Sequence, residues 1–249
     1  MKRIRIIPVL LLVNDGFYKT VKFKDAQYIG DPINTVKIFN EKCADEAVVL
    51  DITATKDKKA INFKKITEIA GEAFMPMAYG GGIKTFEEAV RVFNAGYEKV
   101  VLNSSASETP ALIGEIAKAY GSQSVVVSID AGTNLFGKYR VYTHSGSKNT
   151  GKLPAEYAKA AEQEGAGEIL INSIDRDGTW EGYDIGLIRS VSEVVTVPVI
   201  ACGGASGMDD FKKAIVEGGA SAVAAGSLFV YQKKGKGVLI SFPSQALII

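Results

Sequence analysis

The most constraining feature of this 249-residue chain is an internal repeat with one fixed offset. Glu46 recurs 122 positions later as Glu168, and the same offset relates Gly81, Gly82, Gly96 and Ser105 to Gly203, Gly204, Gly218 and Ser227. Each copy contains a hydrophobic run, a glycine cluster, an amphipathic stretch and a second hydrophobic run. A register kept over half of the chain indicates duplication of a half-domain. It also predicts two similar ligand-binding sites that face each other.

Short apolar runs alternate with stretches of helical period along the whole chain. The expected strands cover 5–12, 46–51, 75–79, 99–102, 124–129, 168–172, 197–201 and 222–225, and the clearest helices cover 86–93 and 209–216. Eight strands with intervening helices in a chain of this length predict a single (β/α)8 TIM barrel over 1–249. Its half-barrels would span about 1–122 and 123–249. An open doubly wound sheet explains the alternation of elements but leaves the repeat unexplained.

Two polar, glycine-containing stretches are expected to be long loops after strands 1 and 5. They cover 13–23 and 131–151, and the second contains a candidate hairpin at 137–143. The first 13 residues combine basic and apolar residues but have no small-residue cleavage site. They are therefore interpreted as a buried first strand rather than a signal peptide.

Composition excludes several classes of function. The net charge is +1 without a long basic run, which argues against nucleic-acid or membrane-surface binding driven by bulk charge. No apolar run approaches the roughly 18 residues of a transmembrane helix. Cys43 and Cys202 lack metal-ligand spacing and are expected to be free buried thiols in a cytoplasmic protein. His144 is the only histidine and is expected to lie in a surface loop, so neither a metal site nor an organic cofactor is implied.

The glycine clusters follow strands at their carboxyl ends. Glycines there let backbone N–H groups approach a phosphate, and barrels commonly bind phosphate after strands 7 and 8. Gly203-Gly204 and Gly226-Ser227 follow those strands, while Gly81-Gly82 and Asn103-Ser104 follow strands 3 and 4. A single glycine pair can be only a tight turn. Two pairs, each with a small polar cluster 22 residues later, predict a phosphorylated ligand held at both ends.

Asp130 ends the fifth expected strand and is the candidate general acid/base. Capping of a loop is the alternative role for this carboxylate. The duplication predicts a matching acid at the end of strand 1, where the sequence has Leu11 instead. One member of an expected catalytic pair is therefore missing.

Other charged residues mark the two ends of the expected strands. Asp51, Asp175 and Asp177 follow strands, where they could bind ligand hydroxyls or form Asx-turns. Four charges of alternating sign begin strands 1, 2, 4 and 6: Arg5, Glu46, Lys99 and Glu168. These four either face solvent separately or close the barrel bottom as a ring of salt bridges.

Several of these segments resemble one known family. The matching motifs are RIIP at 5–8, Gly30-Asp31-Pro32, LDITA at 50–54, GGGI at 80–83, NTG at 149–151, GAGEIL at 165–170 and SIDRDGT at 173–179. Through them the chain resembles the cyclase subunit of imidazole glycerol phosphate synthase, the HisF family, over nearly its whole length.

The resemblance implies a specific chemistry. Ammonia from a HisH-like glutaminase docked on the amino-terminal barrel face passes a charged gate, matched here by Arg5, Glu46, Lys99 and Glu168. It then attacks a ribulose-type substrate that carries two phosphates, and two aspartates perform the proton transfers. Asp130 matches one of them. The implied phosphate-binding residues are Lys19, Gly81, Gly82, Asn103, Ser104, Asp177, Gly203, Gly204, Gly226 and Ser227, and the implied substrate-binding residues are Asp51, Asp175, Ser145 and Gly146.

Leu11 replaces the second aspartate and removes a proton-transfer group worth roughly 10²–10⁴-fold in rate. The segments 10–12, 19–23 and 238–241 resemble paralogues associated with surface-polysaccharide genes, in which a third protein amidates a sugar. The leading hypothesis is an ammonia-supplying subunit of this kind. An ordinary histidine-pathway cyclase, in which Asp130 works with water or with Asp51, is the second. A non-catalytic scaffold that binds a bisphosphate is the third.

Overall fold

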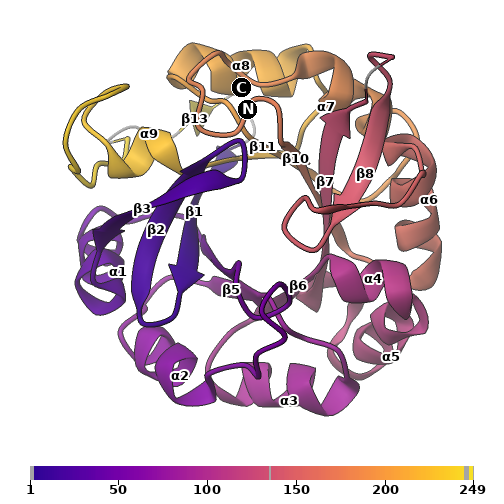
Figure 1. Ribbon diagram of the computed structural model, residues 1–249, viewed down its shortest axis with the longest axis horizontal. Helices are drawn as coiled ribbons and strands as arrows, with labels where there is room; N and C mark the ends of the chain where they lie inside the picture. The colour runs from indigo at the N-terminus through magenta and orange to yellow at the C-terminus, as the bar shows by residue number, and fades with distance from the viewer. Residues whose placement is uncertain (1–2, 135, 244–246, 249) are drawn as a thin grey trace.

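The structure is a computed structural model that describes residues 3–134, 136–243 and 247–248. Its centre is a closed barrel of parallel strands, seen end-on in Figure 1. In spatial order the strands are β10 (Glu168–Ser173), β11 (Val199–Cys202), β12 (Ala222–Ala225), β1 (Arg3–Val13), β4 (Ala47–Asp51), β5 (Met77–Gly80), β6 (Lys99–Leu102) and β7 (Val125–Thr133). Pairing of β10 with β7 closes the circle. The (β/α)8 prediction is confirmed, and the open doubly wound sheet is wrong.

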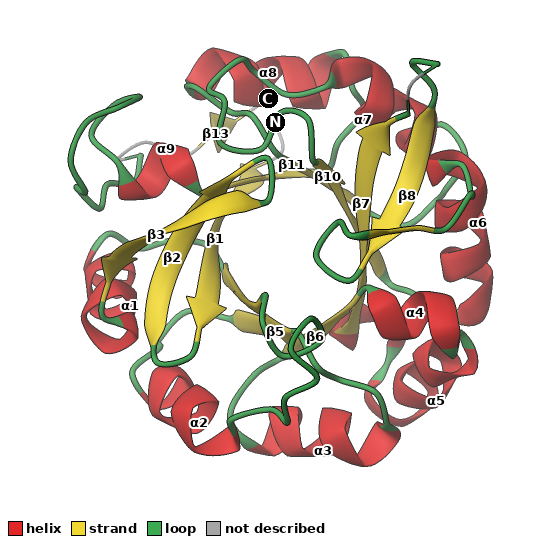
Figure 2. Cartoon of the chain, viewed as in Figure 1, coloured by secondary structure: helices red, strands yellow, loops and turns green. Residues whose placement is uncertain are grey.

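Helices surround the barrel as an outer layer (Figure 2). They are α1 (Pro32–Glu41), α2 (Phe63–Gly71), α3 (Phe86–Asn94), α4 (Ser104–Glu108), α5 (Ala111–Tyr120), α6 (Pro154–Glu164), α7 (Ile185–Ser192), α8 (Met208–Val216) and α9 (Ser227–Val230). The expected helices 86–93 and 209–216 are confirmed as α3 and α8. Helix α3 begins with a capping box between Thr85 and Glu88, and its Ala89 and Val92 are buried.

The prediction of a long loop at 13–23 is wrong. After β1 the chain forms an antiparallel hairpin of β2 (Gly16–Val21) and β3 (Lys24–Gly30), and β2 pairs with the end of β1. Phe17 is fully buried and supplies the apolar contact that fixes this hairpin. The surrounding Asn, Asp, Gly and Lys residues hide the strand pattern. We refer to β2 and β3 with their turn as the mouth hairpin.

The second expected loop, 131–151, also contains more strand than predicted. Strand β7 continues to Thr133 and pairs antiparallel with β8 (Tyr139–Thr143), so the candidate hairpin at 137–143 is one arm of a longer hairpin rather than a hairpin by itself. A short β9 (Lys148–Asn149) pairs with β8. Strands β5 and β11 start two residues later than predicted and end one residue later. A further strand, β13 (Leu247–Ile248), pairs with the start of β1.

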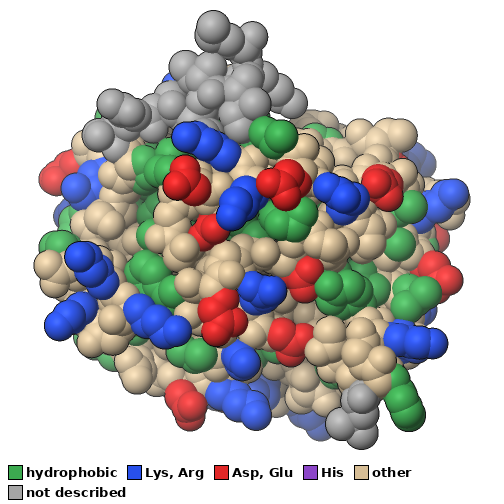
Figure 3. All heavy atoms as spheres, turned by 90° about the horizontal axis from the view of Figure 1, so that it is seen from above, with side chains coloured by type: hydrophobic (Ala, Val, Ile, Leu, Met, Phe, Trp, Pro, Cys, Tyr) green, Lys and Arg blue, Asp and Glu red, His purple; other side chains and the backbone are tan. Residues whose placement is uncertain are grey.

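Charged side chains of both signs are interspersed on the side of the barrel that carries α8 (Figure 3). This distribution agrees with the near-neutral net charge of the chain. None of the helices in the described part of the chain is long and apolar enough to cross a membrane.

Candidate active site

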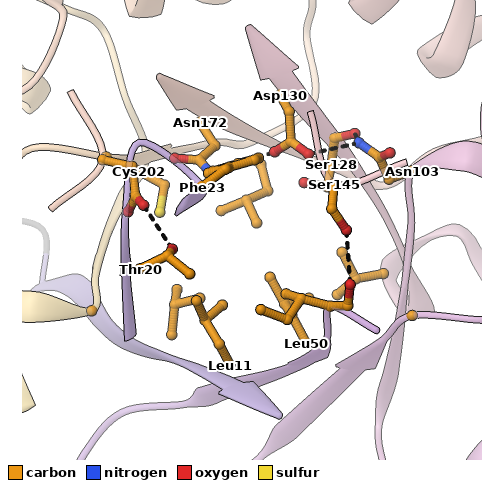
Figure 4. Close-up of a pocket in the computed structure, with 18 of the residues that line it drawn as sticks. Leu11, Thr20, Phe23, Leu50, Asn103, Ser128, Asp130, Ser145, Asn172 and Cys202 are labelled. Carbon is orange, nitrogen blue, oxygen red and sulfur yellow. Dashed lines mark hydrogen bonds between the residues drawn. The ribbon is translucent and has the colours of Figure 1, made fainter. Parts of the chain in front are cut away.

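A cavity opens at the carboxyl ends of the barrel strands, where both halves of the chain contribute side chains (Figure 4). It brings together most of the residues implied by sequence: Leu11, Lys19, Asp51, Gly81, Gly82, Asn103, Ser104, Asp130, Ser145, Asp177, Gly203, Gly204, Gly226 and Ser227. Asp175 and Gly146 are not in the lining. Asp175 instead accepts hydrogen bonds from the Thr133 backbone N–H and hydroxyl, and Gly146 lies beside the Phe23 ring.

Asp130 lies on β7 at one wall of this cavity, and Leu11 and Leu50 lie across from it (Figure 4). The amide of Asn103 donates to one oxygen of Asp130 at 3.2 Å, and the amide of Asn172 donates to the other at 3.4 Å. Burial raises the pKa of Asp130 to about 7, and the Asp177 carboxylate adds to the rise. Asp130 can therefore donate or accept a proton near neutral pH. Leu11 can do neither.

The raised pKa of Asp130 links folding to pH. Between the unfolded pKa near 3.8 and the folded pKa near 7, the folded chain holds a proton that the unfolded chain has lost. We therefore expect the Asp130 contribution to stability to fall, as pH rises from about 4 to 7, by up to about 1.4 kcal/mol per pH unit. Urea unfolding across this range should show a flatter pH profile for Asp130→Asn than for the native chain. Identical profiles would mean that Asp130 titrates normally.

Lys19, from the mouth hairpin, is buried inside the cavity. Its Nζ donates to Asp177 Oδ1 at 2.8 Å and to the Thr20 carbonyl at 2.7 Å. The Thr20 hydroxyl donates to the other Asp177 oxygen at 3.1 Å, and the Lys22 N–H donates to the Asp177 carbonyl at 2.9 Å. These contacts hold the hairpin over the mouth. The Lys19 side chain also lies against Gly226, so its ammonium is close to one of the two implied phosphate sites.

The repeated glycines occupy equivalent places after β5 and β11, and both pairs have positive φ. Gly81 has φ +108°, and a Cβ there would lie 2.2 Å from the Asp51 carbonyl oxygen. Gly204 has φ +107°, and a Cβ there would lie 2.3 Å from the Gly182 carbonyl oxygen. Only glycine fits these positions. Because glycine has no side chain, the backbone N–H groups can lie at the cavity wall.

We expect Gly204→Ala to destabilise the fold by about 2–3 kcal/mol, because it combines left-handed backbone strain with a steric clash. Gly137→Ala is the matched control, since Gly137 has φ +71° but a Cβ there would meet no atom within 4 Å. That control should cost only about 1 kcal/mol. Equal losses for the two variants in urea unfolding would show that the close approach at Gly204 carries no cost.

The turn between β8 and β9 covers the other implied phosphate site. The His144 N–H donates to the Ser104 hydroxyl at 3.1 Å, and the Ser145 hydroxyl donates to the Ile52 carbonyl at 2.9 Å. The His144 ring lies outside the cavity lining, 3.5 Å from Glu108. It therefore sits in a loop away from the lining, as expected.

Four charges close the opposite end of the barrel. Arg5 bonds Glu46 and Glu168, each at 2.6 Å, and Lys99 bonds the same two carboxylates, each at 3.0 Å. The four side chains form a closed ring of ion pairs, so the alternative in which they face solvent separately is wrong. Side chains two residues along a strand share a face. Above the ring the interior is accordingly apolar, with Ile7, Val48, Ala78, Val101, Val126, Leu170, Ile200 and Ala222.

We expect Glu46→Ala to destabilise the fold by about 2 kcal/mol, because it leaves Arg5 and Lys99 to share one carboxylate. Part of the cost is screened, since the Arg5 side chain is 32% exposed. Glu98→Ala, which removes an exposed acid beside Lys99, is the control and should be neutral. A Glu46→Ala variant as stable as the native chain in urea would show that the ring adds nothing to stability.

Sequence reasoning missed several lining residues. Asn172 is the simplest of them, because it ends an expected strand just as Asp130 does. Phe23 and Trp180 reach the cavity from turns with φ +62° and +63°, for which the sequence has no signal. Cys202 also lines it, and burial raises the pKa of its thiol to about 12, so the thiol stays protonated.

Both cysteines are free, as predicted, but Cys43 is exposed rather than buried because it lies in the turn after α1. Within the described residues, no group of three or more His, Cys, Asp and Glu side chains could hold a metal ion.

Comparison with known proteins agrees with this geometry. The family described as histidine biosynthesis protein matches residues 5–236. A Pseudomonas aeruginosa protein provisionally named imidazole glycerol phosphate synthase subunit hisF2 is 49% identical over 98% of this chain and 97% of its own. A Leptospira interrogans protein provisionally named subunit HisF is 48% identical over 98% and 97%. Subunit HisF of Alkaliphilus metalliredigens is 41% identical over 92% and 91%. The chain therefore belongs to the histidine biosynthesis protein family and is HisF-like.

Proposed function

We propose that this HisF-like subunit receives ammonia from a partner glutaminase and supplies it, through a third protein in the cytoplasm, for amidation of a surface-polysaccharide sugar. One observation carries the proposal. The chain has the ring at the amino-terminal end and the apolar interior, whereas Leu11 faces Asp130 across the cavity. The other two carboxylates of the lining are already hydrogen-bonded, Asp51 to Thr53 and Ala54, and Asp177 to Lys19 and Thr20. A barrel that can conduct ammonia but lacks a complete acid/base pair is better suited to supplying ammonia to another protein than to catalysing the cyclase reaction.

The glutaminase is proposed to dock on the amino-terminal face of the barrel. Phe74 lies there, in the loop between α2 and β5, and its side chain is 92% exposed. A large exposed apolar side chain beside a polar surface is a common anchor in protein interfaces. The ring of Arg5, Glu46, Lys99 and Glu168 opens toward the same face, so ammonia released by the partner would meet it first.

The cavity is proposed to hold a phosphorylated ligand. Lys19 supplies a buried cation beside Gly226, and the glycine pairs present backbone N–H groups on both sides. Asn103, Ser104, Asp177 and Ser227 add polar groups, and Asp51 and Ser145 lie at the cavity wall.

Deletion of the gene in its natural host tests the proposal. We expect the deletion strain to lose amide groups from its surface polysaccharide, measured by mass spectrometry, while it still grows without histidine. Re-expression of the native chain should restore the amide groups. A deletion strain with fully amidated polysaccharide would contradict the proposal.

A second candidate is the histidine-pathway cyclase itself. The observation in its favour is Asp130, whose pKa near 7 suits a group that both donates and accepts protons. Complementation of a cyclase-deficient histidine auxotroph by the native chain tests this candidate. Growth without histidine supports it, and growth only with histidine excludes it.

A further inference from the structure

The eighth unit of the barrel ends differently from the other seven. Each of the other seven barrel strands leads to a helix of at least eight residues before the next barrel strand, and after β6 this helix, α5, comes behind the five-residue α4. Strand β12 is followed only by the four-residue α9 within residues 222–243. The chain then forms a hairpin over residues 230–239, which we call the lysine hairpin. The Leu239 N–H donates to the Val230 carbonyl at 3.0 Å, and the Gln232 N–H donates to the Gly237 carbonyl at 3.1 Å. In Figure 1 it projects outward beside α9.

Residues 232–239 of the lysine hairpin are all exposed, whereas Val230 at its start is buried. Neighbouring side chains of a strand point to opposite faces, so one of two successive apolar residues is normally covered. Here Val238 is 45% exposed and Leu239 is 53% exposed. The base is nevertheless fixed, because the Ser241 N–H donates to the Phe229 carbonyl at 2.8 Å and the Phe242 ring packs on Phe229 and Phe39.

The tip of the hairpin is strongly basic. Lys233, Lys234 and Lys236 are exposed, and the turn is closed by a hydrogen bond from the Lys236 N–H to the Lys233 carbonyl at 3.0 Å. The chain has no Asp or Glu after Glu217. Within the described ranges, the ion pairs of this protein do not include these three lysines. The tip is therefore an uncompensated cluster of positive charge on a fixed support.

We propose that the lysine hairpin is the docking site for an acidic surface of the ammonia-using protein, a proposal that rests on the proposed function. Its position fits this partner, since the hairpin follows Ser227 at the end of the barrel where the cavity opens. The ring lies at the opposite end, so glutaminase and acceptor protein bind without overlap. Its composition fits as well, because two partly exposed aliphatic side chains lie next to the charged tip and add apolar contact area to the charge.

An anionic membrane is the less favoured occupant. Three lysines and two partly exposed aliphatic residues give only weak and reversible attraction to a bilayer, which needs a second signal for stable anchoring. For a partner protein with an acidic surface, the same three lysines would fix its orientation on the barrel and raise its association rate.

The test uses the natural host and a triple charge reversal, Lys233→Glu with Lys234→Glu and Lys236→Glu. The control reverses three exposed lysines on helices, Lys64, Lys118 and Lys159, to Glu. We expect polysaccharide amide content to fall at least tenfold in the hairpin variant and to stay unchanged in the control. Purified hairpin variant should keep its melting temperature and its affinity for the glutaminase.

A crosslinking arm identifies the occupant. A photoreactive residue at position 234 should capture one protein that amidation requires, and a Glu→Lys reversal on that protein should restore amidation to the hairpin variant. Full amidation in the hairpin variant overturns the proposal. The proposal is also overturned if position 234 captures no protein while the native chain binds phosphatidylglycerol vesicles and the hairpin variant does not. If deletion of the whole gene leaves amidation intact, the proposed function fails instead, which separates the two failures.

Discussion

Leu11→Asp is expected to raise ammonia-dependent turnover of the histidine-pathway bisphosphate by roughly 10²–10⁴-fold, the usual contribution of a positioned acid/base group. Arg5, Ile7, Val9 and Leu11 alternate along β1, so position 11 faces the interior at the carboxyl end of the strand. It looks across the cavity at Asp130 (Figure 4). A carboxylate there would complete a pair with Asp130. Repulsion between the two negative charges raises the pKa of one carboxyl above that of the other, so one acts as the acid and the other as the base.

Two controls separate proton transfer from packing. Leu11→Asn has the same shape as Leu11→Asp but cannot exchange a proton, and Leu11→Ala only removes apolar contacts with the barrel interior. Steady-state rates with ammonium salt should rise for the aspartate variant alone. If all three variants stay at background while remaining folded, the missing acid is not what limits the native cavity.

Lys19→Met is expected to weaken binding of a phosphorylated ligand at least 100-fold and to release the mouth hairpin. The substitution leaves Asp177 buried without its cation, and loss of one partner from a buried pair costs about 3–5 kcal/mol. The hairpin depends on the same residue, because Thr20 and Lys22 also bond Asp177. Calorimetry with inorganic phosphate and with a sugar phosphate measures the affinity. Hydrogen exchange at the Lys22 amide measures release of the hairpin.

Lys22→Met is the matched control on the same hairpin. Lys22 is exposed, and its contact to Asp177 uses the backbone N–H, which the substitution keeps. It should bind ligand like the native chain and keep the slow amide exchange. Unchanged ligand affinity in Lys19→Met would remove the buried lysine from the binding site.

The sequence was most informative where a pattern repeats. The 122-residue offset placed Gly81 and Gly203 at equivalent strand ends, and the alternation along strands placed the four ring charges at one end of the barrel. Asp130 could be found because strand ends in a barrel meet at one mouth. Regular spacing therefore predicted the barrel and most of the cavity wall.

The sequence was least informative where single contacts decide the structure. The mouth hairpin depends on the burial of Phe17 and on the Lys19–Asp177 pair, which joins residues 158 positions apart. Trp180 enters the cavity through one left-handed backbone conformation. The eighth unit has the barrel strand β12, but the lysine hairpin follows it where the other units have a longer helix. None of these features follows from local periodicity.

Turnover of the histidine-pathway bisphosphate by the purified native chain with ammonium salt, followed by product absorbance, is the decisive measurement. We expect no product above background, because Leu11 faces Asp130 where a second acid is needed, and the Asp51 carboxylate is held by Thr53 and Ala54. Turnover comparable to that of a HisF relative with both aspartates would contradict this expectation. Leu11 would then be compatible with cyclisation, and the chain would be a histidine-pathway enzyme.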